Sequence, residues 1–343
     1  MLPAVAGGNV WRASVRSPPS AALVDPPRRC PDLASGSPWR HLAIPSARGG
    51  RVMARGSGSA SALDAGTESA ALARVLSDPT FELIPLKNAL EQTSRMPTGR
   101  TVSVTASPGK TIEATVELAI ELEGAGLRAI PHLSARMIRD RAHLATILDR
   151  LADAGIDRAF VVGGDADEPG EFLDGLSLLR AMADLGRLPS DLGCPSYPQG
   201  HPDIPDDVLL QALHDKAELV QYMTTQLCFD PKAIGAFIAA RRAEGITLPV
   251  KLGIPGVAEI PKLLSISART GVKDASRFVL KNARFVGALL RSGGIYRPTQ
   301  LLRRLALLIA DPAANVLGLH VYTFNNVPAT EAWRRDAEAA AIG

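Results

Sequence analysis

Short apolar runs rich in β-branched residues alternate with stretches of helical period from residue 80 onward, and this alternation constrains the fold most strongly. Strands that alternate with helices lie parallel in one sheet and are joined by right-handed crossovers. The sequence predicts eight such strands, at residues 80–85, 101–105, 129–133, 159–163, 191–197, 222–229, 249–254 and 316–324.

Helical patterns fill the gaps between the predicted strands. At residues 111–126, for example, Thr115, Leu118 and Leu122 share one face, while most of the glutamates lie off it. Eight strand–helix units over roughly 260 residues match the size of a (β/α)8 TIM barrel. A doubly wound open sheet is the main competitor, but no glycine-rich dinucleotide fingerprint follows the first strand. Further helices are expected at residues 206–219, 231–245, 274–291 and 299–309.

The first 72 residues differ in composition from the rest of the chain. Residues 1–60 carry eight arginines and only two acids, Asp25 and Asp32, whereas the remaining residues are slightly acidic overall. Proline pairs and a Gly/Ser/Ala run leave this segment too little apolar surface to become ordered. We expect residues 1–72 to be disordered; a true start at Met53 and an arginine-rich transit peptide are the alternatives. The folded barrel domain is expected to span residues 73–343.

Composition excludes several classes of protein for the folded part. The chain has three cysteines, Cys30, Cys194 and Cys228, which are too few for a disulfide framework. No apolar run approaches the ~20 residues that a membrane helix needs. Because the excess positive charge lies in the first 60 residues, the folded part lacks the basic surface that nucleic-acid binding requires. We expect a cytoplasmic enzyme that acts on a small-molecule substrate, and the chain could form homo-oligomers.

Polar side chains dominate the carboxyl ends of the predicted strands. In a (β/α)8 barrel these ends converge on one mouth, where such enzymes hold their active sites. The set includes two carboxylates, Glu82 and Asp165. No metal site is expected from His132, His201 and the cysteines, because their spacing predicts no tetrahedral convergence. The eight strand-end residues are Glu82, Thr105, His132, Asp165, Tyr197, Gln226, Gly253 and Tyr322.

Motifs at these strand ends resemble those of methylenetetrahydrofolate reductases. The most specific are YPxxHP at residues 197–202 and TQxxFD at residues 225–230. Any one motif alone is a weak signal, but eight in order at compatible spacing are a strong one. The resemblance covers about residues 78–327, and its other elements lie at residues 80–85, 103–105, 132–133, 164–165, 249–255 and 320–325.

The resemblance implies a (β/α)8 barrel that holds a flavin, FAD, at its mouth and acts in one-carbon metabolism and methionine biosynthesis. Family members reduce 5,10-methylenetetrahydrofolate to 5-methyltetrahydrofolate with NADH or NADPH as the electron source. By resemblance, Glu82 matches the general acid and Asp165 the carboxylate beside flavin and folate. Gln226 matches the glutamine that contacts the pterin, whose edge presents both a donor and an acceptor. The flavin is expected to meet Thr105, His132, Gly164, Asp165, Tyr197, His201 and Tyr322, with Lys216 near its phosphates.

These residue types suit the chemistry of that reaction. The methylene bridge must open to an iminium before it accepts hydride, and the departing nitrogen then needs a proton. Apolar side chains flank Glu82 in the sequence, and we expect this setting to favour its neutral form. Asp165 is expected to stay ionised and to stabilise the cation; alternatively, it caps the following helix or shapes a turn. The flanking residues of Glu82 are Phe81, Leu83 and Ile84.

Several positions depart from the family pattern, and most of them concern the cofactor. Gly163 stands where the family usually has arginine, Ala106 where an aromatic residue is common, and Gln199 where glutamate is frequent. The basic cluster before the sixth strand is reduced to Lys216. Two alternatives therefore stay open: a folate-linked one-carbon enzyme without tightly bound flavin, and a folate-binding relative without catalysis. The histidines outside the mouth, expected at the surface, are His41, His143 and His214.

Overall fold

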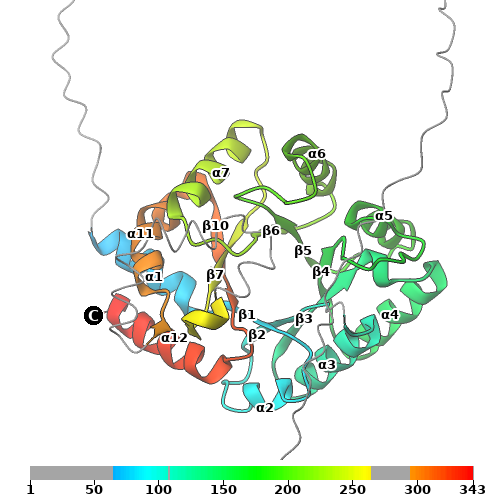
Figure 1. Cartoon of the computed structure of the whole chain (residues 1–343), viewed down its shortest axis with the longest axis horizontal. Coiled ribbons are helices and arrows are strands. Elements are labelled where there is room, and N and C mark those ends of the chain that lie inside the picture. Colours follow the sequence, from blue (N-terminus) through cyan, green and yellow to red (C-terminus); the bar gives the residue numbers. More distant parts are fainter. Residues whose placement is uncertain (1–64, 107–108, 264–293, 343) are drawn as a thin grey trace, which may run out of the picture. The chain divides into compact units, whose positions relative to one another are not determined.

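The computed structural model describes residues 65–106, 109–263 and 294–342, and it confirms the predicted barrel. Eight parallel strands close in the order β1-β10-β7-β6-β5-β4-β3-β2 (Figure 1). Each strand overlaps one of the predicted runs. Their bounds are β1 (Thr80–Leu83), β2 (Thr101–Val104), β3 (Arg128–Ser134), β4 (Arg158–Val162), β5 (Asp191–Ser196), β6 (Tyr222–Thr225), β7 (Val250–Pro255) and β10 (Val316–Tyr322).

Helices surround the strands (Figure 1). The helices expected at residues 111–126, 206–219, 231–245 and 299–309 are all present, and the one expected at 274–291 lies outside the described residues. None of the described helices combines the length and apolar character needed to cross a bilayer. Their bounds are α2 (Ala89–Thr93), α3 (Ile112–Gly124), α4 (Arg141–Asp153), α5 (Gly175–Asp184), α6 (Asp206–Ala217), α7 (Pro231–Ala243), α11 (Thr299–Ala310) and α12 (Val327–Ile342), with single 3-10 turns η1 (Ala135–Met137) and η2 (Pro312–Ala314).

An additional helix, α1 (Ala65–Ser77), precedes the first strand and packs against α11 and α12. The expected boundary between residues 72 and 73 lies inside this helix. The reason is tertiary: Ala71, Val75 and Leu76 are buried against the barrel, although the alanine-rich sequence has only a weak helical period.

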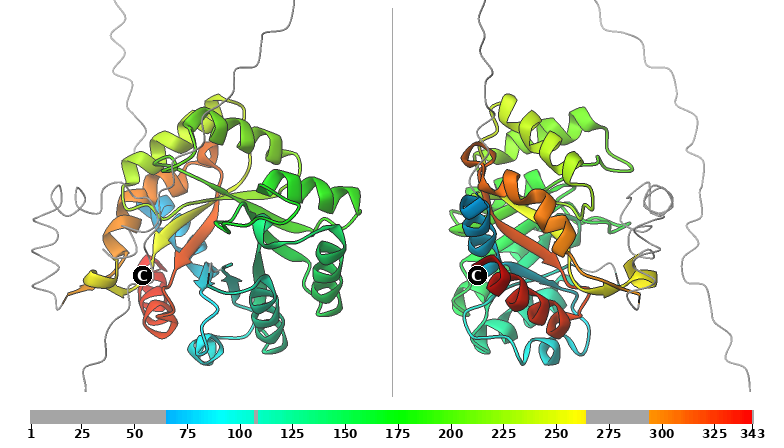
Figure 2. Two further views of the ribbon diagram at one scale, coloured as in Figure 1. Left: turned by 45° about the vertical axis from the view of Figure 1, so that its right-hand side comes forward. Right: turned by 90° about the vertical axis from the view of Figure 1, so that its left-hand side faces the viewer.

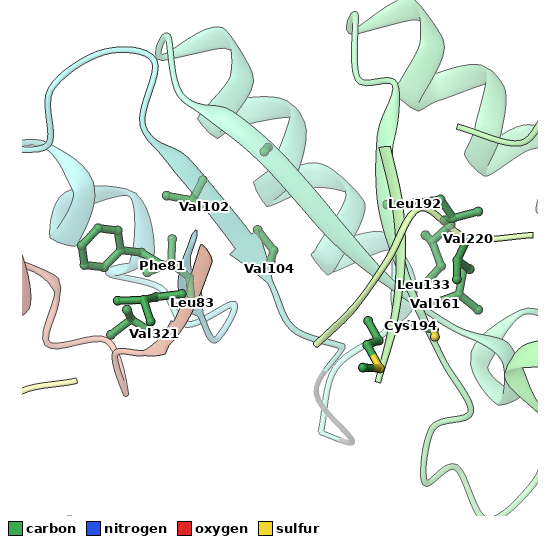
Figure 3. Close-up of a cluster of buried hydrophobic side chains, with 14 of the residues drawn as sticks. Phe81, Leu83, Val102, Val104, Leu133, Val161, Leu192, Cys194, Val220 and Val321 are labelled. Atoms are coloured by element: carbon green, nitrogen blue, oxygen red, sulfur yellow. The ribbon is translucent and has the colours of Figure 1, made fainter. Parts of the chain in front are cut away.

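Apolar side chains on the outward faces of the strands form the main core, between the barrel and its helices. Because successive residues of a strand point to opposite faces, β1 directs Phe81 and Leu83 outward, where both are fully buried. Figure 3 shows these two residues beside Val321, and a second group that includes Leu133 and Val161. The space between strands and helices is therefore filled by apolar side chains. The side chains that could bind a ligand lie on the inward faces of the strands.

The interior of the barrel is filled by rings and polar groups instead. Ile130, Phe160 and Tyr222 form a small apolar cluster there. Residue 193 is glycine because a Cβ at this position would overlap the Tyr222 ring. Toward the amino-terminal end of the strands, Lys251 Nζ lies 3.9 Å from the centre of the Tyr222 ring. Side chains therefore close the barrel at the amino-terminal end of its strands.

A two-stranded antiparallel sheet follows β7 and is formed by β8 (Ala258–Glu259) and β9 (Ile295–Tyr296). The two strands lie side by side at one end of the barrel, in yellow and orange in Figure 2. Ala258 and Tyr296 pack with Leu227 and Phe324 in a small apolar cluster. Because Leu227 and Phe324 follow β6 and β10, this sheet covers part of the carboxyl-terminal end of the barrel.

One histidine expected at the surface is buried, so that prediction is wrong. His143 is 8% exposed, and its Nε2 lies 2.9 Å from Oε1 of Glu113. Its Nδ1 accepts a hydrogen bond from the backbone N–H of Arg139 at 3.2 Å. The ring is held there because His143 lies in the first turn of α4, where Asp140 caps its backbone N–H. His214 is half-buried, and His41 lies outside the described residues.

Candidate active site at the mouth of the barrel

Glu82 projects from β1 into the barrel, where its carboxylate meets a histidine. Glu82 Oε2 lies 3.0 Å from Nε2 of His320 on β10, and the Glu82 side chain is 15% exposed. The apolar setting expected from its sequence neighbours is wrong, because strand alternation turns Phe81 and Leu83 to the opposite face. Within the described residues Glu82 Oε1 makes no hydrogen bond. That oxygen is therefore available to a molecule bound at the mouth.

His132 on β3 presents an unused ring nitrogen to the same interior. The residue is 6% exposed, and its Nε2 has no hydrogen-bond partner in the part of the chain that the structure describes. Its ring centre lies 4.8 Å from that of Phe160 and 6.3 Å from that of His320. Burial, and then the nearby His320, lower the pKa of His132 to about 3. The ring is therefore neutral at physiological pH.

Two tyrosines of the mouth, Tyr322 and Tyr197, are largely buried. Burial raises the pKa of Tyr322, and the charges of Glu82 and Tyr197 raise it further. Burial likewise raises the pKa of Tyr197 to about 12, and Asp165 acts in the same direction. Both tyrosines are therefore neutral at physiological pH. That Glu82 and Asp165 act on one ligand stays a prediction.

Asp165 follows β4 on an exposed loop, and a glycine fixes its direction. Gly164 has a φ of 87°, and a Cβ there would overlap Oγ of Ser134 on β3. Only glycine combines this backbone conformation with the close approach. Asp165 does not cap the following helix: Asp174 caps α5 and accepts a backbone N–H of its first turn at 2.8 Å. The helix-cap alternative is therefore wrong.

Gln226 lies immediately after β6 and is half-buried. Its backbone N–H donates to the carbonyl of Ser196 at 2.7 Å, which continues the pairing of β5 and β6. Its Oε1 accepts the backbone N–H of Leu227 at 2.8 Å. The hydroxyl of Tyr322 donates to the neighbouring carbonyl of Thr225 at 3.3 Å, which ties β10 to β6. The side-chain NH2 of Gln226 is the group left over for a ligand.

The other residues predicted to line a cofactor divide into two groups. Thr105 directly follows β2, and its backbone N–H donates a hydrogen bond to the carbonyl of Leu83 at 2.8 Å. His201 follows β5 and meets Tyr197 edge to face, with ring centres 5.3 Å apart. Both lie beyond strand ends at the mouth. Lys216, in contrast, lies in the last turn of α6, which leads into the start of β6. Lys216 makes no hydrogen bond or ion pair with the other predicted residues in the described part of the chain, and its place near the cofactor phosphates stays a prediction.

Two residues of the mouth received no role from the sequence, His320 and Ser134. His320 precedes Tyr322 by two positions, and Ser134 follows His132 by two positions, so each shares a strand face with a predicted residue. Ser134 Oγ is buried without a partner among the described residues. The period of two was the available signal: one step back from Tyr322 finds His320, and one step forward from His132 finds Ser134.

The ligand atoms of Glu82, His132 and His320 all lie within 4.8 Å of one another. This grouping differs from the set of His132, His201 and the cysteines, from which the sequence predicts no metal site. Histidines that bind metals are oriented by a hydrogen bond at their second ring nitrogen. Neither His132 nor His320 has such a bond in the described ranges. The contact that the cluster does make is the hydrogen bond between Glu82 and His320.

The mouth suits the ring system of a flavin better than its phosphates. His132 Nε2 and Ser134 Oγ are buried groups without partners in the described part, and they offer hydrogen bonds to a planar heterocycle. A Cβ at Gly163 would meet nothing within 4 Å, so space is open beside them. The chain beyond Gly164 is acidic and exposed, with Asp165 followed by further carboxylates at 167 and 168. Acidic side chains there oppose a phosphate group.

Comparison with known proteins agrees with this barrel. A sequence model of the methylenetetrahydrofolate reductase family matches residues 81–334. An uncharacterized protein from Clostridium thermocellum, which binds two copies of 5-methyl-5,6,7,8-tetrahydrofolic acid, is similar in structure with a TM-score of 0.52. It is 13% identical, and the match covers 79% of this chain and 98% of that protein. At this identity the likeness establishes a shared fold.

Two further solved structures align less closely. A proposed deoxyribose-phosphate aldolase from Toxoplasma gondii ME49 has a TM-score of 0.43 and 11% identity, over 80% of this chain and 98% of its own. A proposed lyase or mutase from Burkholderia cenocepacia J2315 has a TM-score of 0.40 and 15% identity, over 81% and 86%. These two matches are too distant to inform the function.

Proposed function

Because the chain belongs to the methylenetetrahydrofolate reductase family, we propose that it reduces 5,10-methylenetetrahydrofolate to 5-methyltetrahydrofolate at the mouth of its barrel. NADH or NADPH is the proposed source of electrons. The observation that carries the proposal is the Glu82 carboxylate, held 3.0 Å from His320 inside the barrel with its second oxygen unused among the described residues. A protein of the same fold binds 5-methyltetrahydrofolic acid, the product of this reaction.

Glu82 supplies the proton in the proposed mechanism. When the methylene bridge opens, the carbon–nitrogen bond breaks, and its electron pair stays on the departing nitrogen. Glu82 donates a proton from Oε1 to that nitrogen, while Oε2 stays hydrogen-bonded to His320. The product of this step is an iminium cation, whose carbon then accepts hydride and becomes the methyl group. A positioned carboxylic acid commonly contributes about 10²–10⁴-fold to such a step.

The neighbouring polar groups bind and orient the folate in this proposal. The Gln226 NH2 donates to an acceptor on the pterin edge, because its Oε1 is already engaged by Leu227. Asp165, exposed beside the mouth, stabilises the iminium charge. Tyr322 and Tyr197 stay neutral, because burial raises the pKa of both. The folded mouth is thus arranged for a cationic transition state.

A bound FAD would supply hydride transfer between the nicotinamide and the folate. In this proposal its ring system meets His132 Nε2 and Ser134 Oγ, the two buried groups without partners in the described ranges. Thr105, Tyr197 and His201 border the same opening. Because Lys216 lies at the far end of α6, this chain offers the flavin phosphates little help from that residue.

The placement of Lys216 and the acidic loop after Gly164 favour a second candidate, the same folate reduction without tightly bound flavin. In that version hydride passes from the nicotinamide to the folate directly, and the nicotinamide ring occupies the space beside His132. The role of Glu82 is identical, because the departing nitrogen needs its proton in either case. The two candidates differ in the cofactor and not in the acid.

The visible absorption spectrum of the purified protein, followed by turnover, tests both candidates. A yellow protein that bleaches with NADH and regains its colour with methylenetetrahydrofolate supports the flavin-dependent reductase. A colourless protein that oxidises NADH only when methylenetetrahydrofolate is present supports direct transfer. A protein that binds 5-methyltetrahydrofolate but oxidises neither NADH nor NADPH under both conditions would be a folate-binding relative, and the proposal would be wrong.

A further inference from the structure

The turn that follows β10, residues 323–325, has an unusual backbone. Phe324 has a φ of 53° and Asn325 a φ of 59°, so two successive residues other than glycine are left-handed. A bulky aromatic residue rarely adopts this conformation, and where it does the surrounding structure must enforce it. Phe324 is 7% exposed and packs with Leu227 and Tyr296 in the cluster beside the mouth. Strain of this kind concentrates at functional sites.

The Asn325 side-chain amide makes two hydrogen bonds to the backbone of one residue, Ile84, which directly follows β1. Its Oδ1 accepts the backbone N–H of Ile84 at 2.8 Å, and its Nδ2 donates to the carbonyl of Ile84 at 2.9 Å. The ladder between β1 and β10 ends at the pair Glu82–Tyr322. The amide therefore extends the pairing of the two strands beyond the point where their backbones separate.

Thr323 adds a second bond from the same turn. Its hydroxyl donates to the backbone carbonyl of Glu82 at 2.5 Å and accepts the backbone N–H of Asn325 at 3.1 Å. Thr323 is fully buried. With the hydrogen bond between His320 and the carboxylate, four bonds from one segment hold this part of β1. One is at the Glu82 side chain, one is at the Glu82 carbonyl, and two are at the backbone of Ile84, two residues later.

We infer that Asn325 is a positioning residue that, with Thr323 and His320, sets the place of the Glu82 carboxylate for proton transfer. The inference rests on the proposed function for its catalytic consequence. Asn325 acts through the backbone of Ile84 and does not itself reach the reacting atoms. Proton transfer is sensitive to displacements of about 1 Å, which can cost 10²-fold in rate. The positive φ angles of Phe324 and Asn325 are the strain that this turn accepts in order to hold the Glu82 carboxylate beside His320.

A matched control exists at the opposite end of the same strand. Asn315 precedes β10, is also left-handed with a φ of 50°, and also uses its side chain on a backbone carbonyl, that of Thr247, at 3.0 Å. Glycine at either position keeps the left-handed backbone and removes only the amide. The variants Asn325→Gly and Asn315→Gly therefore lose comparable local interactions, but only the first touches the segment that carries Glu82.

The first measurement needs no turnover. The chain has six histidines, so selective ¹⁵N labelling gives few ring signals, and the His320→Gln variant assigns the one of interest. In the resting protein, Asn325→Gly should move the His320 ring signals in the direction that Glu82→Gln moves them, whereas Asn315→Gly should leave them in place. Unchanged His320 signals in Asn325→Gly would overturn the inference, whether or not the protein reduces folate.

The second measurement is the steady-state rate of NADH oxidation that depends on methylenetetrahydrofolate. Asn325→Gly should lower kcat by roughly 10–100-fold with little change in KM, and Asn315→Gly should leave both unchanged. Equal losses in the two variants would indicate general destabilisation and would also overturn the inference. If the unmodified protein does not turn over, the proposed function fails on that result alone, and the His320 signals still decide the placement of Glu82.

Discussion

The two ends of the barrel treat their polar side chains differently. At the amino-terminal end of the strands, charged groups are paired with one another. Arg158 Nη2 lies 2.6 Å from Glu123 Oε2, and the Arg158 Nε–H also donates to a backbone carbonyl of β3. Asp78 lies between two arginines, Arg100 at 3.9 Å and Arg128 at 3.8 Å. These five charged side chains are therefore paired with one another.

At the carboxyl-terminal mouth, by contrast, buried polar atoms lack protein partners. His132 Nε2 and Ser134 Oγ are both in this state within the described ranges, and Asp165 is exposed beside them. A buried polar group without a partner costs about 1–3 kcal/mol, which a ligand that supplies the partner recovers. The contrast teaches that the barrel is stabilised at one end and prepared for a ligand at the other, as expected for this fold.

The sharpest test of this contrast exchanges a carboxylate for an amide at each end. Glu82→Gln should lower folate reduction by about 10²–10⁴-fold, because the amide has no acidic proton to give. Reduction of a bound flavin by NADH should stay nearly intact, since that half-reaction does not use the proton. The matched change at the other end, Glu123→Gln, should leave turnover unchanged. Stopped-flow measurement of both half-reactions checks this, and equal loss in the two half-reactions would refute the role of Glu82.

Removing the paired cation should produce the reverse pattern. Arg158→Ala leaves Glu123 without its partner in a half-buried position. We expect the free energy of unfolding to fall by about 1.5–3 kcal/mol, the usual value for hydrogen bonds to charged groups, with kcat unchanged. Urea denaturation and steady-state kinetics measure the two quantities. A loss of turnover with unchanged stability would mean that the amino-terminal end takes part in the chemistry.

The glycine before Asp165 links stability and function at the mouth. Gly164→Ala should destabilise the protein by about 1–3 kcal/mol, because alanine is strained at positive φ and its Cβ overlaps Ser134 Oγ. Adding Ser134→Gly removes the overlap but not the backbone strain, so part of the loss should be recovered. A double-mutant cycle by denaturation separates the two causes. Strictly additive losses would show that the overlap is relieved elsewhere.

Sequence reasoning located the mouth because its signals are local. Strand period, strand ends and motif order were sufficient to place Glu82, Asp165 and Gln226 at the carboxyl ends of their strands. It could not pair Glu82 with His320, because that contact depends on the stagger between two strands distant in the sequence. It also missed the turn that carries Asn325, since left-handed backbone at two successive residues has no dependable sequence signal.

Another error has a similar physical origin. His143 was assigned to the surface because a lone histidine on a helix has no local pattern, yet its contact with Glu113 spans two helices. The role of Lys216 rests on resemblance alone and stays a prediction; the structure places this residue in the last turn of α6, and a helix that follows a barrel strand runs back toward the amino-terminal end. Both placements are decided by tertiary arrangement and not by composition.

The smallest predicted effect concerns the pair formed by the buried His143 and the partly exposed Glu113. Burial acts to raise the pKa of Glu113, but hydrogen bonds from its own backbone, Thr111 and His143 outweigh it and lower the pKa below the ordinary 4.5. A lowered pKa stabilises the folded state above the unfolded pKa, and this contribution disappears as the pH falls through the folded value. Because the Glu113 side chain is 41% exposed, Glu113→Gln should cost only about 0.2–1 kcal/mol at pH 7.

Denaturation of this variant and of the unmodified protein over a range of pH checks the sign. The difference in unfolding free energy should shrink as the pH is lowered below 4.5. A difference that stays constant across the range would show that the carboxylate charge of Glu113 does not contribute. The mouth should be unaffected at pH 7, so turnover serves as the control.

A crystal structure of the protein with 5-methyltetrahydrofolate bound tests the central claim most directly. We predict the pterin at the carboxyl-terminal mouth, with the Gln226 NH2 on its edge and Oε1 of Glu82 facing the nitrogen that leaves the methylene bridge. A folate bound at the amino-terminal end, or at the mouth with Glu82 turned away from it toward the protein interior, would contradict the account.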